Sequence, residues 1–480
     1  MNYFVTTSIP YVNGEPHLGH AMEFVMADVL ARYARAQGRN VIFSTGTDEH
    51  GGKIAEKAAE KGVKPIELSN QMSQKFRDLV TALNVVPDRF IRTTDKGHEQ
   101  RAQLIWKAIE KDIYKKNYVG WYCTGDEEFF TETVVKENNG ICPDHNRPYE
   151  KIEEENYFFR LSSYTDEIKK RIESGSFQIV PKTKRNEILS VINEGLEDIS
   201  ISRPKDKIEW GIPVPGDHTQ VMYVWFEALM NYITVLGYPE HDDFKHFWPA
   251  DVQVIGKGIL RFHAAIWPGM LLALNLPLPK KLYVHGYVTV DDKKMSKSLG
   301  NSVSPSEIID KYGADTFRYY FLRHIPSYED GDFSWDKLDA AYNGELANEL
   351  GNAVQRTAAM IQKYQEGAIG DIPVSSHDTA EYRKALEECR FDRALDEIWE
   401  QVRGLNQYID AEKPWAIAKT DDKEHLREVL AYQVGSLLEV AELLEPFLPS
   451  AAAKIKAVFE SGLVRPIEGT LFPKFDERQS

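Results

Sequence analysis

The sequence is poor in cysteine and lacks long apolar runs. Its three cysteines, Cys123, Cys142 and Cys389, are too few and too scattered for a disulfide framework, which indicates a reducing compartment. Residues 1–10 lack the basic start and apolar run of a signal peptide, so we expect a cytoplasmic location. The most apolar stretch, residues 266–279, is interrupted by prolines and is shorter than the roughly 20 residues that a membrane helix needs. We therefore expect no membrane span.

The chain also lacks an excess of positive charge. Its 58 basic and 74 acidic residues give a formal net charge of −16, which argues against indiscriminate binding to a phosphate backbone. Any nucleic acid partner must therefore meet a local basic face. With 42% hydrophobic and 28% charged residues, the composition is that of a folded protein. A length of 480 residues exceeds what one core usually fills, so we expect two to four structural units.

The beginning of the chain predicts a strand, a loop, a helix and a second strand. Residues 2–8 alternate and are rich in Phe, Val and Thr, and a cluster of Pro, Asn and Gly follows over residues 10–16. Apolar residues then recur at helical spacing from Leu18 to about Gly38, and residues 40–44 form another apolar run. This order predicts a βαβ unit, and hence a parallel sheet whose ligands bind at the carboxyl ends of the strands.

The remaining chain divides into three regions with different patterns. Residues 117–215 have short runs and many charges, and we interpret them as an insertion. A second α/β portion follows, with apolar runs at residues 252–255 and 282–290, and Ser304 with the proline and glutamate after it predicts a capped helix. After about Trp335 apolar residues recur only at helical spacing, which predicts a helical bundle.

Two histidines stand where the first predicted helix begins. His17 and His20 are three residues apart and share one helical turn, and the N–H groups at a helix start favour phosphate. Both imidazoles can donate hydrogen bonds to phosphate oxygens, and Gly19 between them leaves room for a nucleotide. Taken alone, the motif is short, and capping or surface histidines explain it equally well.

A loop rich in lysine, serine and glycine precedes the capped helix. It covers residues 293–301 and reads KKMSKSLGN. Lys294 and Lys297, with Ser296 between them, suit a triphosphate, because lysines neutralise the charge that moves onto a leaving pyrophosphate. By composition alone, a solvated basic turn explains this loop better.

The two motifs together resemble the paired HIGH and KMSKS signatures of the class I aminoacyl-tRNA synthetases. They occur in the family's order and about 275 residues apart, and the pairing is more specific than either motif. The segments between them resemble the methionyl-tRNA synthetase family, and the resemblance runs through nearly the whole chain. It implies an α/β fold: a Rossmann-like catalytic domain with a parallel sheet, split by an inserted connective domain and followed by an all-α anticodon-binding bundle. It also implies His17, His20, Lys294 and Lys297 as the catalytic residues, and His17, Gly19, His20, Gly256, Lys294, Ser296 and Lys297 as the ATP-binding residues.

The resemblance further implies where the domains lie. We expect the two halves of the catalytic domain at residues 1–116 and 216–280, the connective insertion at 117–215, the lysine loop and stem-contact region at 281–340, and the anticodon-binding domain at 341–480.

Four segments, residues 8–14, 45–51, 223–232 and 256–267, resemble the parts of the family that bind methionine. A carboxylate suits the substrate's ammonium group, and aromatic rings suit a polarisable sulfur. Without this context, aromatic residues at helical spacing are more often core than pocket. The implied methionine-binding residues are Ile9, Tyr11, Asp48, Trp225, Ala228, Leu229, Tyr232, Ile259, His263 and Trp267.

One position departs from the family pattern. The chain has Gly256, Lys257 and Gly258 where the family usually has Gly-Lys-Asp, so an acidic group that contacts the nucleotide or braces the site is missing. We expect this change to lower the activity or the affinity for ATP.

The inserted region carries a degenerate metal-binding knuckle. Cys123 and Asp126 are spaced as Cys-x-x-Asp, and Cys142 and His145 as Cys-x-x-His, which resembles the family's zinc knuckle with one cysteine replaced. An oxygen ligand in place of a sulfur gives a less common zinc set than three cysteines and a histidine. A Zn²⁺ ion held by these four residues and a knuckle that folds without metal both stay open.

Three residues of the predicted bundle match the family's anticodon-binding signature. Asn352 and Arg356 can read unpaired base edges, and Trp415 can stack on an extruded base. Separately they mean little, since Asn and Arg four residues apart on a helix most often form a solvated face. The last residues resemble the end of the family's core, so we expect no appended module and a monomer.

The resemblance implies an enzyme that uses ATP and Mg²⁺ to convert L-methionine into methionyl-adenylate and pyrophosphate. Methionine would then pass to the 3′ terminal adenosine of tRNA(Met), the initiator tRNA included. The alternatives are a class I synthetase for isoleucine, leucine, valine or cysteine, a nucleotidyltransferase, and a tRNA-binding paralogue without catalysis. The roughly 100 inserted residues leave no room for the editing domain of the branched-chain enzymes, and a nucleotidyltransferase would not need the helical tail. The intact histidines and lysines argue against the paralogue, while Gly258 keeps it open.

Overall fold

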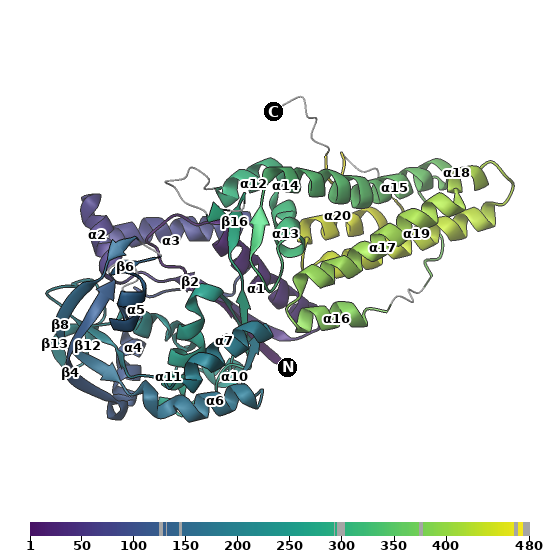
Figure 1. The fold of residues 1–480 in the computed structure, drawn as a ribbon. Helices are drawn as coiled ribbons and strands as arrows, with labels where there is room; N and C mark the ends of the chain where they lie inside the picture. The colour runs from purple at the N-terminus through teal and green to yellow at the C-terminus, as the bar shows by residue number, and fades with distance from the viewer. Residues whose placement is uncertain are drawn as a thin grey trace. The chain divides into compact units, whose positions relative to one another are not determined.

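The protein is described by a computed structural model that covers residues 1–123, 128–130, 132–143, 146–291, 293–294, 303–373, 378–464 and 469–473. The chain forms two compact units, each assembled from separate stretches of sequence (Figure 1). The first unit contains Met1–Glu15, Val41–Arg77 and Pro87–Val284, and the second contains Pro16–Asn40, Asp78–Val86 and His285–Ser480. None of the described helices is long and apolar enough to cross a membrane.

A six-stranded sheet forms the centre of the first unit. Neighbouring strands include the parallel pairs Val5/Val252, Ser44/Arg89 and Lys281/Gln178. The predicted strand and helix at the start of the chain are confirmed, and the first two strands are neighbours, as a βαβ unit requires. In spatial order the strands are β3 (Arg89–Arg92), β2 (Asn40–Thr47), β1 (Asn2–Thr7), β14 (Val252–Gly256), β15 (Lys281–His285) and β9 (Gln178–Val180).

Strand β9 comes from the range that the sequence pattern marks as an insertion. It contributes only three residues and pairs in parallel with β15. A three-residue strand carries too little alternation to be recognised in a sequence. The central sheet therefore has one edge strand that the pattern does not reveal.

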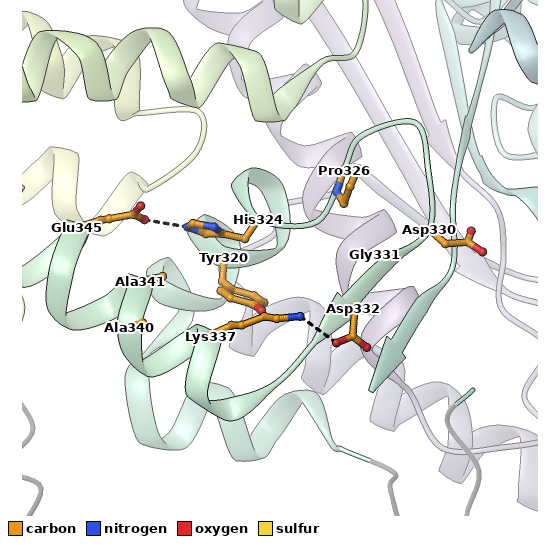
Figure 2. Close-up of a pocket in the computed structure, with 10 residues that line it drawn as sticks. All are labelled: Tyr320, His324, Pro326, Asp330, Gly331, Asp332, Lys337, Ala340, Ala341 and Glu345. Atoms are coloured by element: carbon orange, nitrogen blue, oxygen red, sulfur yellow. Dashed lines mark hydrogen bonds and ion pairs between the residues drawn. The ribbon is translucent and has the colours of Figure 1, made fainter. Parts of the chain in front are cut away.

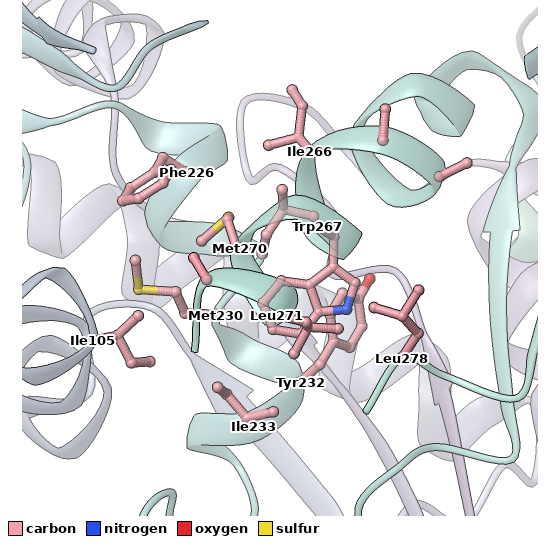
Figure 3. Close-up of a cluster of buried hydrophobic side chains, with 14 of the residues drawn as sticks. Ile105, Phe226, Met230, Tyr232, Ile233, Ile266, Trp267, Met270, Leu271 and Leu278 are labelled. Carbon is pink, nitrogen blue, oxygen red and sulfur yellow. The ribbon is translucent and has the colours of Figure 1, made fainter. Parts of the chain in front are cut away.

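Apolar side chains from strands and helices fill one core in this unit. Phe4 of β1 and Trp267 are fully buried, and the cluster extends from the sheet to the helices beside it. Figure 3 shows part of this cluster, in which Tyr232 and Trp267 lie among aliphatic side chains and methionines. The helices of this part of the chain are α2 (Gly52–Glu60), α3 (Pro65–Ala82), α4 (Lys96–Ala108), α8 (Val224–Ala228), α9 (Asn231–Thr234), α10 (Asp242–Phe247), α11 (Trp267–Ala273) and the short turns η1 (Glu110–Asp112), η2 (Leu161–Tyr164), η3 (Lys257–Ile259) and η4 (Phe262–Ile266).

The region between β3 and β14 adds smaller antiparallel sheets. Strands β4 (Ile113–Cys123) and β8 (Glu150–Phe159) form a long hairpin-like pair, with β10 (Ile199–Ser200) and β5 (Glu128–Phe130) at the two edges. The other strands are β11 (Ser202–Pro204), β13 (Asp217–Met222) and β12 (Pro213–Val214) in one sheet and β6 (Ile141–Cys142) and β7 (Arg147–Pro148) in another. The helices here are α5 (Glu132–Glu137), α6 (Thr165–Glu173) and α7 (Lys182–Asn193).

The second unit is mainly helical, and its C-terminal helices form a bundle (Figure 1). The predicted capping box is confirmed, because the Ser304 side chain accepts from a backbone N–H and Glu307 accepts from the N–H of Ser304. Among the described residues the last strand is β18 (Gly331–Phe333), which lies in one sheet with β16 (Val288–Val290) and β17 (Lys293–Lys294). The helices are α1 (Leu18–Ala36), α12 (Pro305–Tyr312), α13 (Ala314–Arg323), α14 (Trp335–Ala341), η6 (Tyr342–Gly351), α15 (Asn352–Gln365), α16 (Ala380–Glu387), α17 (Phe391–Glu412), α18 (Pro414–Ile417), α19 (Lys423–Leu444) and α20 (Pro449–Phe459).

The apolar run at residues 282–290 is divided between two sheets. Gly286 lies at the break between β15 and β16, and a Cβ atom there would come within 2.2 Å of the carbonyl oxygen of Glu329. Only glycine allows this close approach of two backbone segments. Strand β16 therefore pairs with β18 instead of continuing β15.

A buried ion pair ties the helices of the second unit together. Arg318 on α13 and Asp28 on α1 are both fully buried, and the guanidinium lies 2.8 Å from the carboxylate. The same guanidinium donates to the carbonyl oxygens of Pro446 and Phe447 at 2.7 and 2.6 Å. Because Arg318 stays charged, removing its partner leaves a buried charge uncompensated.

We expect the substitution Asp28→Asn to lower the free energy of unfolding by about 3–5 kcal/mol, because of this uncompensated charge. The measurement is the shift of the urea unfolding midpoint, with Glu381→Gln as the control. Glu381 pairs with Lys384 at 3.3 Å between two exposed side chains, and such pairs contribute about 0–1 kcal/mol. Equal midpoints for the two variants would contradict the structural role of the Asp28–Arg318 pair.

Candidate active site

A pocket in the first unit brings together eight of the ten residues predicted to bind methionine. They come from the carboxyl ends of β1 and β2, from α8 and α9, and from η3 and η4. The cavity measures about 20 Å³ in this conformation, so a lining side chain must move before a larger group can enter. The lining residues are Ser8, Ile9, Asp48, Trp225, Ala228, Leu229, Asn231, Tyr232, Ile259 and His263.

Two residues predicted for the pocket do not line it. Trp267 is fully buried and packs behind Tyr232, with 5.8 Å between the ring centroids. Tyr11 packs against the core, and its backbone forms a β-bridge with Asp48. Their methionine-binding role stays a prediction, and in this structure both support residues that do line the cavity.

Tyr232 and His263 form a hydrogen-bonded pair inside the pocket. The His263 Nδ1 atom lies 3.0 Å from the carbonyl oxygen of Ile259, and its Nε2 atom lies 2.7 Å from the Tyr232 hydroxyl. A carbonyl only accepts, so Nδ1 carries the proton of the neutral ring, and Nε2 accepts from the hydroxyl. This bond fixes the orientation of the Tyr232 ring at the cavity wall.

Asp48 is held at the end of β2 by backbone bonds to the first loop. Its N–H donates to Pro10 at 2.9 Å, and its carbonyl oxygen accepts from the N–H of Val12 at 3.1 Å. Its carboxylate accepts from the Thr93 hydroxyl at 3.4 Å, and the residue is only 6% exposed. A buried carboxylate in a small pocket favours a cationic ligand group.

His17 and His20 cap each other at the start of α1. The Nδ1 atom of His17 accepts from the N–H of His20 at 3.3 Å, and the Nδ1 atom of His20 accepts from the N–H of His17 at 3.4 Å. The two rings are stacked, with 3.5 Å between their centroids. Because each Nδ1 accepts, each neutral ring carries its proton on Nε2 and can donate from that atom.

The protein keeps both histidines neutral near pH 7. The pKa of His17 is lowered to about 4, chiefly because nearby protein atoms displace water, although the residue as a whole is exposed; Glu23 opposes this effect and His285 adds to it. The pKa of His20 is lowered well below its ordinary value by burial and by His17 and His285. In the neutral rings the Nε2 atoms carry the protons.

The lysine loop lies largely outside the described residues. Lys294 belongs to β17, whose backbone pairs with β16, while Ser296 and Lys297 are not described. Gly256 ends β14, and Gly258 lies on the exposed turn η3. The ATP-binding roles of these residues stay predictions.

The predicted zinc ligands are described only in part. Cys123 and Cys142 are buried and lie in one cluster with Val135 and Tyr149. Asp126 and His145 lie outside the described residues. Among the residues that are described, no group of three or more His, Cys, Asp or Glu side chains could hold a metal. The zinc site stays a prediction.

The predicted anticodon residues lie on the surface of the bundle. Asn352 and Arg356 lie on α15, and the Arg356 guanidinium is 5.5 Å from the centre of the Trp415 ring. Arg356 also pairs with Asp410 at 2.9 Å, which the sequence did not point to. Trp415 is 37% exposed, so part of this residue is accessible at the surface.

A larger hollow lies in the second unit, and its lining includes none of the residues predicted to bind methionine or ATP. It measures about 560 Å³, and its lining includes charged groups that pair with one another. Figure 2 shows Lys337 beside Asp332 and His324 beside Glu345, at 3.0 and 2.8 Å. The charges in these two pairs already compensate each other. The larger volume of this hollow is therefore not enough to make it the reaction site.

The comparisons with known proteins find relatives over nearly the whole chain. A family model described as tRNA synthetases class I (M) matches residues 3–151 and 145–358, and a model for the anticodon binding domain of methionyl tRNA ligase matches residues 351–465. The methionine–tRNA ligase of Caldanaerobacter subterraneus subsp. tengcongensis is 43% identical over 469 residues, 94% of this chain and 73% of that protein. The one of Brucella melitensis biotype 1 is 40% identical over 510 residues, 99% of this chain and 98% of that protein.

A solved structure is similar over the same length. Mycobacterium tuberculosis methionyl-tRNA synthetase in complex with methionyl-adenylate has a TM-score of 0.91 and 35% identity, covering 98% of this chain and 99% of that one. The parallel sheet, the helix-start histidines and the helical bundle thus define a class I aminoacyl-tRNA synthetase. Within that class, the chain belongs to the M family, that of the methionyl-tRNA synthetases.

Proposed function

We propose that this chain is a methionine–tRNA ligase that activates L-methionine with ATP and transfers it to tRNA(Met). The observation that carries the proposal is the pocket in which Asp48 faces the same cavity as Trp225 and the Tyr232–His263 pair. A carboxylate for the ammonium group and aromatic rings for a polarisable thioether are the two groups that methionine requires. Family membership over nearly the whole chain supports the same substrate.

In the proposed first step, a carboxylate oxygen of methionine attacks the α-phosphorus of ATP. The bond from that phosphorus to the bridging oxygen breaks, and pyrophosphate leaves. The Nε2 donors of His17 and His20 stabilise charge on the phosphate oxygens, and Lys294 and Lys297 neutralise the leaving pyrophosphate. Mg²⁺ would supply further neutralisation of the phosphates. No protein nucleophile is needed.

In the second step, a ribose hydroxyl of the tRNA's terminal adenosine attacks the methionyl carbonyl, and AMP leaves. The helical bundle would bind the anticodon through Asn352, Arg356 and Trp415. We propose tRNA(Met), including the initiator tRNA, as the partner, and a cytoplasmic monomer as the working form. The boundaries at residues 1–116, 117–215, 216–280, 281–340 and 341–480 remain our proposed domain limits.

The test is pyrophosphate exchange into ATP with each of the twenty amino acids. Exchange with methionine alone is expected, because the pocket pairs an ammonium site with a thioether site. Exchange with another amino acid would overturn the substrate but not the class. No exchange with any amino acid, from a folded chain, would favour the tRNA-binding paralogue and make Gly258 the first position to examine.

Replacing Trp415 by alanine is expected to raise KM for tRNA(Met) in aminoacylation by roughly 5- to 100-fold, because stacking on one base contributes about 1–3 kcal/mol. Methionine-dependent pyrophosphate exchange should stay unchanged, since that reaction does not need tRNA. Tyr432→Ala is the control, because Tyr432 is 36% exposed on the same bundle outside the Arg356–Trp415 pair. Equal tRNA KM values for the two variants would contradict the anticodon role.

A further inference from the structure

A buried glutamate lies directly behind the methionine pocket. Glu227 is on α8 between Trp225 and Ala228, which line the cavity, and its side chain is fully buried. Glu227 is not among the residues that line the cavity, and its carboxylate bonds two histidines. Oε1 lies 2.8 Å from Nδ1 of His50, and Oε2 lies 2.8 Å from Nε2 of His98.

The two histidines come from separate segments of the first unit. His50 stands two residues after Asp48, beyond the end of β2, and is 3% exposed. His98 is on α4 and is 2% exposed, and its Nδ1 atom lies 2.8 Å from the Thr234 hydroxyl on α9. Helix α9 also carries Asn231 and Tyr232, which line the pocket. These hydrogen bonds connect the segment that follows Asp48, the proposed partner of the ammonium group, to helices α8 and α9, which carry the proposed partners of the thioether.

The direction of the hydrogen bonds fixes where the protons are. An ionised carboxylate only accepts, so His50 donates from Nδ1 and His98 donates from Nε2. The Nε2 atom of His50 lies 3.7 Å from a carboxylate oxygen of Glu99, so His50 has a carboxylate at each ring nitrogen. This arrangement favours the doubly protonated, charged ring.

The charge state agrees with this geometry. Burial lowers the pKa of His50, but the charge and hydrogen bond of Glu227, the hydrogen bond of Glu99 and the charge of Asp48 raise it to about 10. Burial raises the pKa of Glu227, and the neighbouring His50 and His98 lower it by more, so the net direction is downward. The pair is therefore charged throughout the neutral range.

We propose that Glu227 is a positioning residue for methionine: through His50 and His98 it holds the helices of the thioether pocket in register with the strand end that carries Asp48. This inference rests on the proposed binding of methionine in this pocket. Methionine spans the two sides of the cavity with its ammonium group and its sulfur, so its affinity depends on their spacing. The affinity for ATP does not depend on that spacing.

The experiment compares E227Q with the wild type in methionine-dependent pyrophosphate exchange. A glutamine amide can accept from one histidine only, because its NH₂ group faces the other N–H donor. We expect KM for methionine to rise roughly tenfold, which lies within the span of about 2- to 150-fold for coupled residues in a shared network, while KM for ATP stays within about twofold. E154Q is the matched control, because Glu154 is a buried carboxylate paired with Lys207 at 2.9 Å in the inserted region.

Two further readouts separate positioning from a general loss of structure. In the double-mutant cycle of H50Q and E227Q, the two effects on KM for methionine should be clearly less than additive. In E227Q the pKa of His50 should fall, since the largest cause that raises it is gone and burial remains. The charged form of His50 is then lost at a lower pH than in the wild type, so KM for methionine should begin to rise at a lower pH in E227Q than in the wild type.

Each outcome decides the matter. If the wild type does not use methionine, the proposed function fails, whatever E227Q does. If the wild type uses methionine and E227Q keeps the wild-type KM for methionine, the positioning role is overturned. It is also overturned if E227Q and E154Q both change KM for methionine and KM for ATP to the same extent. Should E227Q not fold, as shown by its thermal unfolding curve, H50Q alone must show the selective rise in KM for methionine.

Discussion

The substitution Asp48→Asn is expected to lower kcat/KM for methionine by roughly 100- to 1000-fold, the largest effect that we predict for the pocket. Asp48 is 6% exposed and is the acidic residue among those that line the cavity. An asparagine keeps the shape but leaves the substrate's ammonium group without a counter-charge in a site that excludes water. Truncating one partner of a buried, hydrogen-bonded charge pair costs about 3–4 kcal/mol, which corresponds to that factor.

The measurement is methionine-dependent pyrophosphate exchange, with KM for ATP determined in parallel. Asp198→Asn is the control, because Asp198 accepts hydrogen bonds from Ser162 and Tyr114 and does not line the pocket. A D48N enzyme that keeps kcat/KM for methionine within threefold of the wild type would show that another group holds the ammonium.

The second large effect is expected from Lys297→Ala. If Lys297 neutralises the leaving pyrophosphate, its loss lowers kcat for exchange by about 100- to 1000-fold, as the removal of a donor to developing charge does elsewhere. KM for methionine should change little, because the interaction exists mainly in the transition state. Methionine binding measured by calorimetry should also be retained.

Lys311→Ala provides the comparison for this substitution. Lys311 is on α12, and its ammonium group lies 4.7 Å from the ring of Tyr312, outside the predicted lysine loop. Loss of activity in both variants would indicate a general effect of charge. Full activity of K297A would remove the loop from the chemistry.

Local patterns predicted the parts of the site that lie on one element. The helix period and the glycine and proline cluster gave the start of α1, so His17 and His20 were placed on one turn before any coordinates. The predicted cap at Ser304 holds for the same reason, since a capping box involves residues only three apart. These signals are local because the bonds that produce them are local.

The methionine-binding residues were predicted from the resemblance to the synthetase family. Periodicity alone would have assigned the aromatic residues among them to the core. That reading is partly correct, because Trp267 is a core residue behind Tyr232. Ser8 and Asn231 line the pocket and were not singled out, since a small polar residue beside a strand or helix end gives no signal of its own.

The sequence by itself determined the order of the first strand, the first helix and the second strand, and the capping box at Ser304, because each depends on neighbours within one turn or one strand. Only the tertiary structure decided that β9 joins the central sheet, that Trp415 meets Arg356, and that Glu227 bonds His50 and His98. The two bonds of Glu227 join residues 177 and 129 positions apart. A sequence pattern repeats over a few residues. Burial of a charge is favourable only where distant segments supply its partners. Whether those segments meet depends on how the whole chain packs.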